Sequence, residues 1–417
     1  MKRLNRIAFS VVCCVFASQA VWAQATIDTV KVHQLNEVVV KGVRAAKEAP
    51  YAVANIKKSE LQQFSRTGKE LPFLLSRTPG ILAWGENGLG TGTSYMRIRG
   101  AAGSRINVTL DGVALNSPED QTVFWANMNS YAALLGSVQI QRGVGSSTNG
   151  DGAFGGSISM ATAFPSLIPT AEVTGSFGSF NTYNTGVSFS TGLLGKHLIF
   201  DGAYHETATD GYIDGTSGRS GSYYGGLTWL ADNFKVSYKN IGNFEKTGQA
   251  WSGVLASDYD TNFTLMSDGI YTYKDMDAAG LGKFNILTAG LVRNGKGDYT
   301  IVPYTMRDGS LWNKTTDNFY QNHNILSAVW TPNDHWSHNF AVHYTYGYGY
   351  YNEFKSQSKF AKFGLTFYDA DGNFVKRSDF VRKKGLTQHT YGIVYNTNYK
   401  DEHWDVIGGL NLQQFRG

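Results

Sequence analysis

The residues able to do chemistry are few in this sequence, and their spacing does not favour a reactive centre. Of nine histidines, four fall close together: His323, His335, His338 and His343. His338 and His343 are five residues apart, so on one strand they would point to opposite faces, and His335 belongs to a predicted short turn. This placement does not favour a single metal site, so we expect no metal here.

Two further patterns resemble ligand-binding motifs without completing them. Asp369-Ala370-Asp371-Gly372-Asn373 is like a calcium loop, but its glycine comes too early and the closing glutamate is absent, which favours a plain turn. The glycine-rich run from 143 to 156 lacks the Gly-Lys-Ser/Thr ending of a phosphate loop. Neither Gly-x-Ser-x-Gly nor His-Glu-x-x-His occurs. We expect no catalytic residues, no enzyme activity and no cofactor.

Positive charge gathers in one predicted long loop, residues 352–386. Capture of an anionic ligand is one interpretation of this loop, and contact with lipopolysaccharide phosphates or simple solvation is the other. The formal net charge of +4 falls close to neutrality once Lys2, Arg3 and Arg6 of the N-terminal segment are set aside, which gives no support for nucleic-acid binding. The basic residues of the loop are Lys355, Lys359, Lys362, Lys376, Arg377, Arg382, Lys383 and Lys384.

Residues 1–23 have the pattern of a secretory signal peptide. A basic start precedes the apolar stretch Ile7 to Phe16, and Val21-Trp22-Ala23 offers a cleavage site. The only cysteines, Cys13 and Cys14, lie inside it, so the exported chain would contain neither disulfides nor cysteine metal sites. The sequence therefore predicts export.

Residues 24–52 are predicted to form a mobile arm with one β-rich island at 35–42, and residues 53–167 a small α/β domain. Capping boxes at Ser59-x-x-Gln62 and Thr67-x-x-Glu70 predict two helix starts. The second helix would carry Leu71, Leu74 and Leu75 on one face before Thr78-Pro79-Gly80 stops it. Asp111-Gly112 predicts a tight turn between strands 106–110 and 113–115, rather than a catalytic carboxylate, because Asp-Gly suits a primed hairpin turn. A short helix near 131–135 and a strand containing Val138 and Ile140 would follow.

Residues 168–417 alternate with period two over unusually long runs. Every even position from Phe340 to Tyr350 is apolar or aromatic, and the odd positions between are small or polar. A soluble sandwich would carry Lys and Glu on its outer face, whereas here the second face is mostly Gly, Ser, Thr and Asn. Such strands are typical of a transmembrane antiparallel β-barrel, with an apolar face toward lipid and the other toward a wet lumen.

The connections agree with a barrel, because short turns alternate with long loops. Short turns are predicted at 194–197, 231–233, 332–334 and 399–402, and long loops near 206–220, 243–315 and 352–386. Tryptophans beside the short turns would form an interfacial aromatic girdle: Trp229, Trp330, Trp336 and Trp404. This alternation counts about nine strands.

Several ordered motifs resemble those of TonB-dependent outer-membrane receptors, and the resemblance covers the whole exported chain. The segments Leu71–Ile81, Met96–Gly100 and Thr109–Asn116 resemble the start and middle of the plug domain of that family. Residues 138–160 resemble its closing segment, although Gln139 and Val144 stand where the family commonly has Glu and Pro. The motif residues implied by the resemblance are Arg97, Gly100, Asp111, Gly112, Gly143, Gly155 and Gly156.

The resemblance also assigns roles in the arm and in two arginines. Glu37, Val38, Val39 and Val40 are similar to a TonB box, a short extended segment that can add a strand to the sheet edge of a periplasmic partner. Taken alone, these four residues could equally form a stray strand. Arg99 and Arg142 would pair with carboxylates of the barrel wall and hold the plug, or else be ordinary solvated arginines.

The function implied is active import of a scarce nutrient across the outer membrane of a Gram-negative bacterium, driven by a TonB-type partner. The resemblance favours a ferric siderophore or haem as ligand, with cobalamin second, and outer-membrane lipid and lipopolysaccharide as surroundings. The alternatives are a passive barrel or adhesin with a plug-like domain, or a glycan importer of the SusC type.

The strand count leads to one more expectation, that the chain is incomplete. Single-chain bacterial barrels have an even number of strands, and a plugged lumen needs ~22. Nine strands therefore could not close around a plug of this size. We expect the full protein to carry 22 strands, of which the nine here are the N-terminal part.

Overall fold

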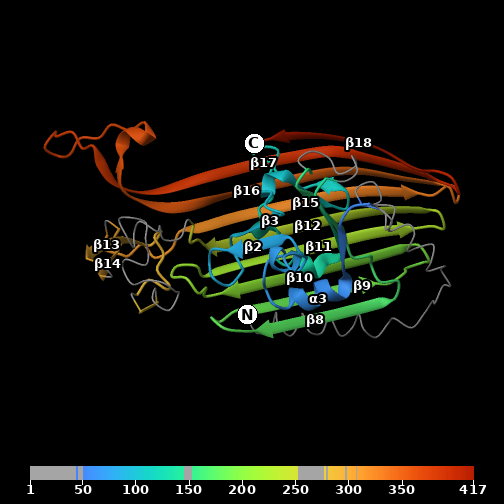
Figure 1. Ribbon diagram of the computed structural model, residues 1–417, viewed down its shortest axis with the longest axis horizontal. Helices are drawn as coiled ribbons and strands as arrows, with labels where there is room; N and C mark the ends of the chain where they lie inside the picture. The colour runs from blue at the N-terminus through green and yellow to red at the C-terminus, as the bar shows by residue number, and fades with distance from the viewer. Residues whose placement is uncertain are drawn as a thin grey trace, which may run out of the picture.

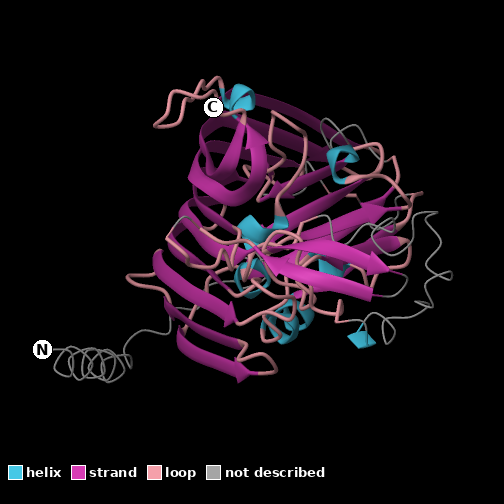
Figure 2. Ribbon diagram, turned by 90° about the vertical axis from the view of Figure 1, so that its left-hand side faces the viewer, coloured by secondary structure: helices cyan, strands magenta, loops and turns pink. Residues whose placement is uncertain are grey.

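The computed structural model describes residues 44–45, 50–144, 153–251, 277–278, 280–295, 298–306 and 308–417. The predicted signal peptide and the segment 35–42 lie outside these residues. The chain forms two units, a small plug unit and a large curved sheet, here called the wall (Figure 1). Seen from the side, the wall strands curve around the helices and short strands of the plug (Figure 2).

The plug unit is built around a five-stranded sheet with strand order β1-β6-β7-β4-β5. Strands β4 and β7 run parallel, and the other neighbours are antiparallel. A separate two-stranded ribbon, β2–β3, packs beside it. The elements in chain order are β1 Val53–Lys57, α3 Lys58–Ser65, α4 Pro72–Leu75, β2 Ile81–Gly85, β3 Ser94–Ile98, β4 Ile106–Leu110, β5 Val113–Ala114, α5 Tyr131–Leu134, β6 Leu135–Arg142 and β7 Gly156–Thr162.

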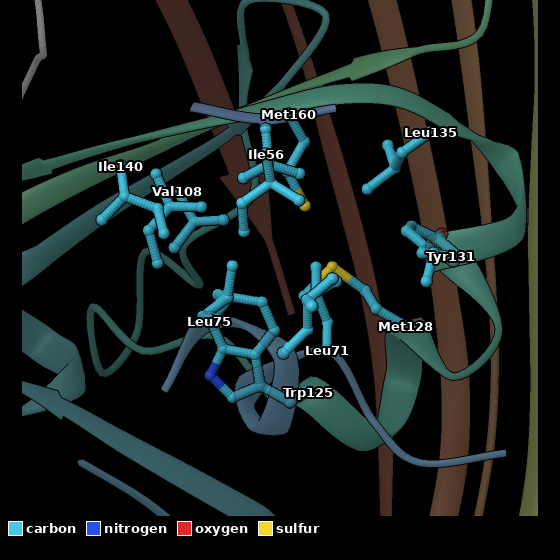
Figure 3. Packing of buried hydrophobic residues seen from close by; sticks show 14 of the residues in the cluster. Ile56, Leu71, Leu75, Val108, Trp125, Met128, Tyr131, Leu135, Ile140 and Met160 are labelled. Atoms are coloured by element: carbon cyan, nitrogen blue, oxygen red, sulfur yellow. The ribbon is translucent and has the colours of Figure 1, made fainter. Parts of the chain in front are cut away.

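The two faces of the plug sheet differ in chemistry because its strands alternate with period two. One face is apolar and packs on the helices, where Leu71, Leu75, Trp125 and Met128 meet it (Figure 3). The opposite face, called the polar face, carries Asn55, Asn107, Thr109, Ser137, Gln139, Gln141, Ser157 and Ser159, which the strand register places side by side. Most of these polar side chains are nevertheless buried.

The structure corrects both predicted helix starts. Helix α3 begins at Lys58, directly where β1 ends, so Ser59 lies inside the helix and Glu60 instead reaches the Lys57 amide. Thr67 closes α3, since its hydroxyl donates to the Phe64 carbonyl, and α4 starts later with proline at its first position. The strand that precedes α3 therefore fixes its start more strongly than local capping does.

Other predictions for the plug are confirmed. Leu71, Leu74 and Leu75 are all buried on one side of the second helix. The β4–β5 hairpin turns at Asp111 and Gly112, whose φ angles of 50° and 83° are the positive values that a primed turn needs.

The wall is one antiparallel sheet of nine strands in the order β18-β17-β16-β15-β12-β11-β10-β9-β8. The predicted count of nine is confirmed for the described part of the chain. Strands β8 and β18 form its two edges. The strands are β8 Pro169–Phe177, β9 Tyr183–Thr191, β10 Leu198–Thr209, β11 Gly218–Leu230, β12 Phe234–Gly248, β15 Thr316–Trp330, β16 Trp336–Lys359, β17 Arg377–Lys400 and β18 Asp405–Arg416, with a separate hairpin of β13 Ala289–Gly295 and β14 Asp298–Pro303.

The wall turns its apolar residues outward and its polar residues toward the plug. On β16, the side chains of Phe340, Val342 and Tyr344 are 44%, 42% and 41% exposed, whereas Ala341 and His343 between them are buried. A soluble sandwich would show the reverse, since its apolar face points inward. The pattern confirms the fold predicted for a membrane barrel wall.

The long loops are shorter than predicted because the strands run on past the expected ends. Strand β16 continues to Lys359 and β17 starts at Arg377, so only residues 360–376 connect them, at the tip of a hairpin that projects beyond the rest of the wall (Figure 1). In this extension Glu353 forms ion pairs with Lys355 on its own strand and with Arg382 on the neighbouring strand β17. The ion pair between the two strands stabilises β16–β17 pairing in a segment that the sequence predicted to be a loop.

No helix among the described residues combines the length and the apolar character needed to cross a bilayer.

Candidate functional site: the contact between plug and wall

A buried ion pair joins the plug to the wall at the β4–β5 turn. The Lys239 ammonium of β12 lies 2.6 Å from Asp111 Oδ2 and 2.5 Å from Thr162 Oγ1. Thr162 itself donates to Asp111 twice, from its amide at 3.0 Å and from its hydroxyl at 2.9 Å. Three residues from three distant parts of the sequence therefore form one closed group, here called the latch.

The latch sits where charge is costly unless it is paired. The side chains of Asp111 and Lys239 are only 4% and 10% exposed. Burial by itself would raise the pKa of Asp111, but the Lys239 charge and the two Thr162 hydrogen bonds outweigh it and lower this pKa below its ordinary value. Asp111 is thus held as a carboxylate, which keeps the pair charged.

Further polar contacts line the same interface on the neighbouring strand β11. Asn129 of the plug donates to Ser220 Oγ at 2.6 Å, and the Ser222 hydroxyl donates to the Asn129 carbonyl. The Tyr131 hydroxyl lies 3.4 Å from Asn243 Oδ1 on β12. The inward face of the wall is therefore a hydrogen-bonding surface matched to the plug.

Apolar contacts complete the seal in two places. Ile241 of β12 belongs to the hydrophobic core of the plug itself. Val113, beside the latch, packs with Ile325, Ala341 and Val394, which come from three different wall strands. Each buried Val or Ile side chain in these contacts contributes about 1.5–3 kcal/mol relative to exposure. The plug is thus held by packing as well as by charge.

A second buried carboxyl lies at the edge of the plug. Glu70 is 1% exposed and accepts a hydrogen bond from the Ser94 hydroxyl. Burial, only partly offset by the bonds from Ser94 and the Gly92 amide, raises the pKa of Glu70 to about 8. Glu70 is therefore mostly protonated at neutral pH, and the capping role predicted for it does not occur.

The predicted arginines all lie on the plug, and their described contacts are local. The Arg142 guanidinium donates to the Pro79 carbonyl at 2.7 Å. Arg97 lies over the Trp84 ring at 5.9 Å, and the Arg99 amide donates to Gly80 at 2.7 Å. Pairing of Arg99 and Arg142 with wall carboxylates stays a prediction.

The predicted motif glycines serve tight backbone geometry. Gly100 and Gly143 adopt positive φ angles of 83° and 92°. A β-carbon on Gly156 would lie 2.6 Å from the Gln141 carbonyl oxygen, and one on Gly155 would lie 2.7 Å from the Arg105 carbonyl oxygen. The closing segment of the plug leaves no room for larger residues at these two positions.

Three of the four clustered histidines and the Asp369 segment have hydrogen-bond partners, whereas neither ring nitrogen of His343 has one among the described residues. His323 contacts the Thr345 hydroxyl at 2.8 Å, and His335 contacts the Lys400 carbonyl at 2.9 Å. Asp369 accepts hydrogen bonds from the amides of Asp371 and Asn373, which makes the segment a side-chain-capped turn as predicted. Among the described residues, no group of three His, Cys, Asp or Glu side chains is arranged to hold a metal ion.

Sequence reasoning missed two contributors to this site, Lys239 and Arg44. Lys239 lies on the inward face of strand β12. A lysine on that face is the one sequence feature that could have indicated a charged contact with the plug. Arg44 follows the predicted TonB box, Glu37 to Val40, by four residues and hydrogen-bonds the polar face of the plug sheet. The partner of Lys239 depends on the packing of the wall against the plug, and the partners of Arg44 depend on the pairing of β6 with β7.

Comparison with known proteins identifies the plug unit. Residues 45–157 match the family model of the TonB-dependent receptor plug domain. No protein with a curated description matches the chain in sequence. The chain thus contains a TonB-dependent receptor plug domain, and this domain is joined to a sheet with the fold of those receptors' barrels.

Solved structures similar to this chain include receptors for ferric chelates. The closed form of the ferric-catecholate import receptor Fiu of E. coli K12 superposes with a TM-score of 0.60 at 13% identity, over 89% of this chain and 47% of the receptor. The ferric preacinetobactin receptor BauA of Acinetobacter baumannii gives 0.58 at 13% identity, over 89% and 48%. The ferric yersiniabactin uptake receptor FyuA of Yersinia pestis gives 0.51 at 12% identity, over 89% and 62%. The chain spans about half the length of the first two receptors.

Proposed function

We propose that this chain supplies the plug and the adjoining wall of a TonB-dependent importer in the outer membrane of a Gram-negative bacterium. The observation that carries the proposal is a plug domain latched through Asp111 and Lys239 to a wall whose outward face is apolar. An apolar outward face suits lipid, and a plug sealed to the inner face suits a closed gate. The protein carries out transport and catalyses no reaction.

The proposed cargo is a ferric chelate of the siderophore type. The receptors named above are described as taking up ferric-catecholate, preacinetobactin and yersiniabactin chelates, and this chain shares their fold. Many such chelates are anionic, and the projecting β16–β17 hairpin carries Lys359, Lys362, Lys376 and Arg377 near its tip. Haem, cobalamin and oligosaccharides are the competing cargoes.

The proposed energy source is a periplasmic TonB-type protein that grips Glu37 to Val40 and pulls on the arm. A strand added edge to edge holds through backbone hydrogen bonds, so the grip needs no folded domain on the receptor side. In this proposal Arg99 and Arg142 pair with carboxylates of the barrel wall and help to hold the plug.

Uptake in whole cells tests the proposal. Cells that produce the receptor should accumulate a radiolabelled ferric siderophore, and accumulation should stop when an uncoupler removes the inner-membrane proton gradient. Ligand binding at 4 °C, measured by quenching of tryptophan fluorescence in the purified receptor, should persist without the gradient. Uptake that ignores the gradient would contradict energy coupling, and binding of cobalamin or oligosaccharide alone would contradict the chosen cargo.

A further inference from the structure

Arg44 is fixed to the polar face of the plug sheet by four hydrogen bonds. Its Nη1 donates to Ser137 Oγ at 2.9 Å, and its Nε donates to Ser159 Oγ at 3.2 Å. Its Nη2 donates to the carbonyl oxygens of the same two serines, at 3.2 Å and 3.0 Å. Because Ser137 lies on β6 and Ser159 on β7, one guanidinium bridges two neighbouring strands.

The next residue, Ala45, is held as firmly through its backbone. Its amide donates to Gln139 Oε1 at 2.7 Å, and the Gln139 amide group donates back to the Ala45 carbonyl at 3.2 Å. The same Gln139 nitrogen lies 3.1 Å from Asn55 Oδ1 on β1. The chain entering the plug is therefore attached to the sheet at two consecutive residues.

These contacts give hydrogen-bond partners to buried polar groups on the polar face. Buried hydroxyl and carbonyl groups are costly unless they are hydrogen-bonded, and Ser159 is only 3% exposed. A guanidinium offers five donors in a fixed planar fork, so it can satisfy four acceptors at once. A lysine, with one compact ammonium, cannot span both serines and both carbonyls in this way.

The strand that receives Arg44 also carries the latch. Ser159 and Thr162 are three residues apart on β7, which corresponds to about 10 Å along a strand. Thr162 donates to Asp111 and accepts from Lys239 of the wall. The middle of β7 is therefore tied to the arm, and its C-terminal end is tied to the wall.

We propose that Arg44 is a releasable clip that keeps the polar face of the plug sheet closed in the resting receptor. It is also the point at which a pull on the arm enters the plug. Lifting Arg44 uncovers Ser137, Gln139 and Ser159 and leaves a hydrophilic surface facing water. The closing of the polar face stands on the contacts alone, whereas the pull rests on the proposed function.

A cysteine probe at the clip tests the closing directly. Residues 24–417 contain no cysteine, so Ser159→Cys introduces a single thiol there, beneath Arg44. In outer-membrane vesicles holding the full receptor and no periplasmic partner, this thiol should react slowly with a polar maleimide. Adding Arg44→Met should raise the labelling rate of order tenfold or more, because charge-assisted hydrogen bonds are lost. Arg44→Lys should give an intermediate rate.

Two controls separate the clip from general damage. Arg105→Met removes another plug arginine, which lies over the Phe154 ring and makes no described contact with Ser159, and it should leave labelling slow. Met160→Cys places the thiol on the apolar face of the same strand, where it should stay protected in the Arg44→Met background. Equal labelling at positions 159 and 160 would mean that Arg44 holds the whole plug, which would overturn a local clip.

Labelling at position 159 that is unchanged by Arg44→Met, or already fast with Arg44 present, would also overturn the clip. A separate experiment tests whether a pull on the arm releases Arg44. In energised cells, the Ser159→Cys receptor with Arg44 intact should become labelled only when the periplasmic partner and the proton gradient are both present. If Arg44→Met opens the face but energised cells never do, the clip stands and the pull on the arm is refuted.

Discussion

Removing one half of the latch is expected to loosen the plug strongly, and the structure sets the size of the effect. Breaking a buried ion pair by deleting one partner costs about 3–5 kcal/mol, because an uncompensated charge is left behind. In Lys239→Met the Asp111 carboxylate keeps two hydrogen bonds from Thr162, which places the cost near 3 kcal/mol. In Asp111→Asn the Lys239 ammonium keeps only the Thr162 hydroxyl and the new amide, which places the cost nearer 5 kcal/mol.

The double variant should recover much of this loss. With both charges gone, neither group is buried unpaired, so Lys239→Met with Asp111→Asn should cost less than the sum of the single changes by about 2–4 kcal/mol. Lys246→Met is the matched control, because Lys246 lies on the same strand β12 but is exposed. That variant should change stability by less than about 0.5 kcal/mol.

The measurement is the protection of a cysteine at Met160, in the apolar core of the plug, against a maleimide under native conditions. A loss of 3 kcal/mol corresponds to a labelling rate about a hundredfold higher when opening and closing of the plug are fast compared with labelling. The reasoning is refuted if either single change leaves the rate within about threefold of the parent, or if the two changes add without coupling.

Three further predictions follow from the arm, the buried carboxyl and the outward face. Val39→Pro should abolish ferric-siderophore uptake and spare surface binding, because proline removes a ladder hydrogen bond, whereas Val30→Pro outside the predicted box should leave uptake unchanged; survival of uptake in Val39→Pro would disprove the box. Since the pKa of Glu70 is raised to about 8 from an ordinary value of 4.5, its protonated form is favoured by folding. The contribution of Glu70 to plug stability should therefore be greatest below about pH 5 and fall by about 1.4 kcal/mol per pH unit between roughly pH 5 and 8. Glu70→Gln should flatten that slope in denaturant titrations at pH 5, 6.5 and 8, and an unchanged slope would contradict it. Val342→Arg should destabilise the wall in lipid vesicles by about 2–4 kcal/mol in urea unfolding, because it places a charge on the lipid-facing side, and a neutral result would mean that this face does not meet lipid.

Local features of the sequence determined the class of the fold. The alternation from Phe340 to Tyr350 required one apolar and one polar face, whatever the rest of the chain did. Asp111-Gly112 required a primed turn, and the spacing of Leu71, Leu74 and Leu75 required a buried stripe. The apolar periodicity and the turn chemistry depend on only a few neighbouring residues, so the sequence alone specifies both.

Tertiary structure decided the ends of elements and the partners of charges. Helix α3 starts where β1 finishes its pairing with β6, and β16 and β17 stay paired as far as Lys359 and Arg377, beyond the ion pair between Glu353 and Arg382. Lys239 meets Asp111 across 128 positions of sequence, and Arg44 meets Ser159 across 115. Such pairs depend on the register of each strand and on how the plug sits against the wall. Since a one-residue slip in register turns a side chain to the opposite face, no local pattern specifies them.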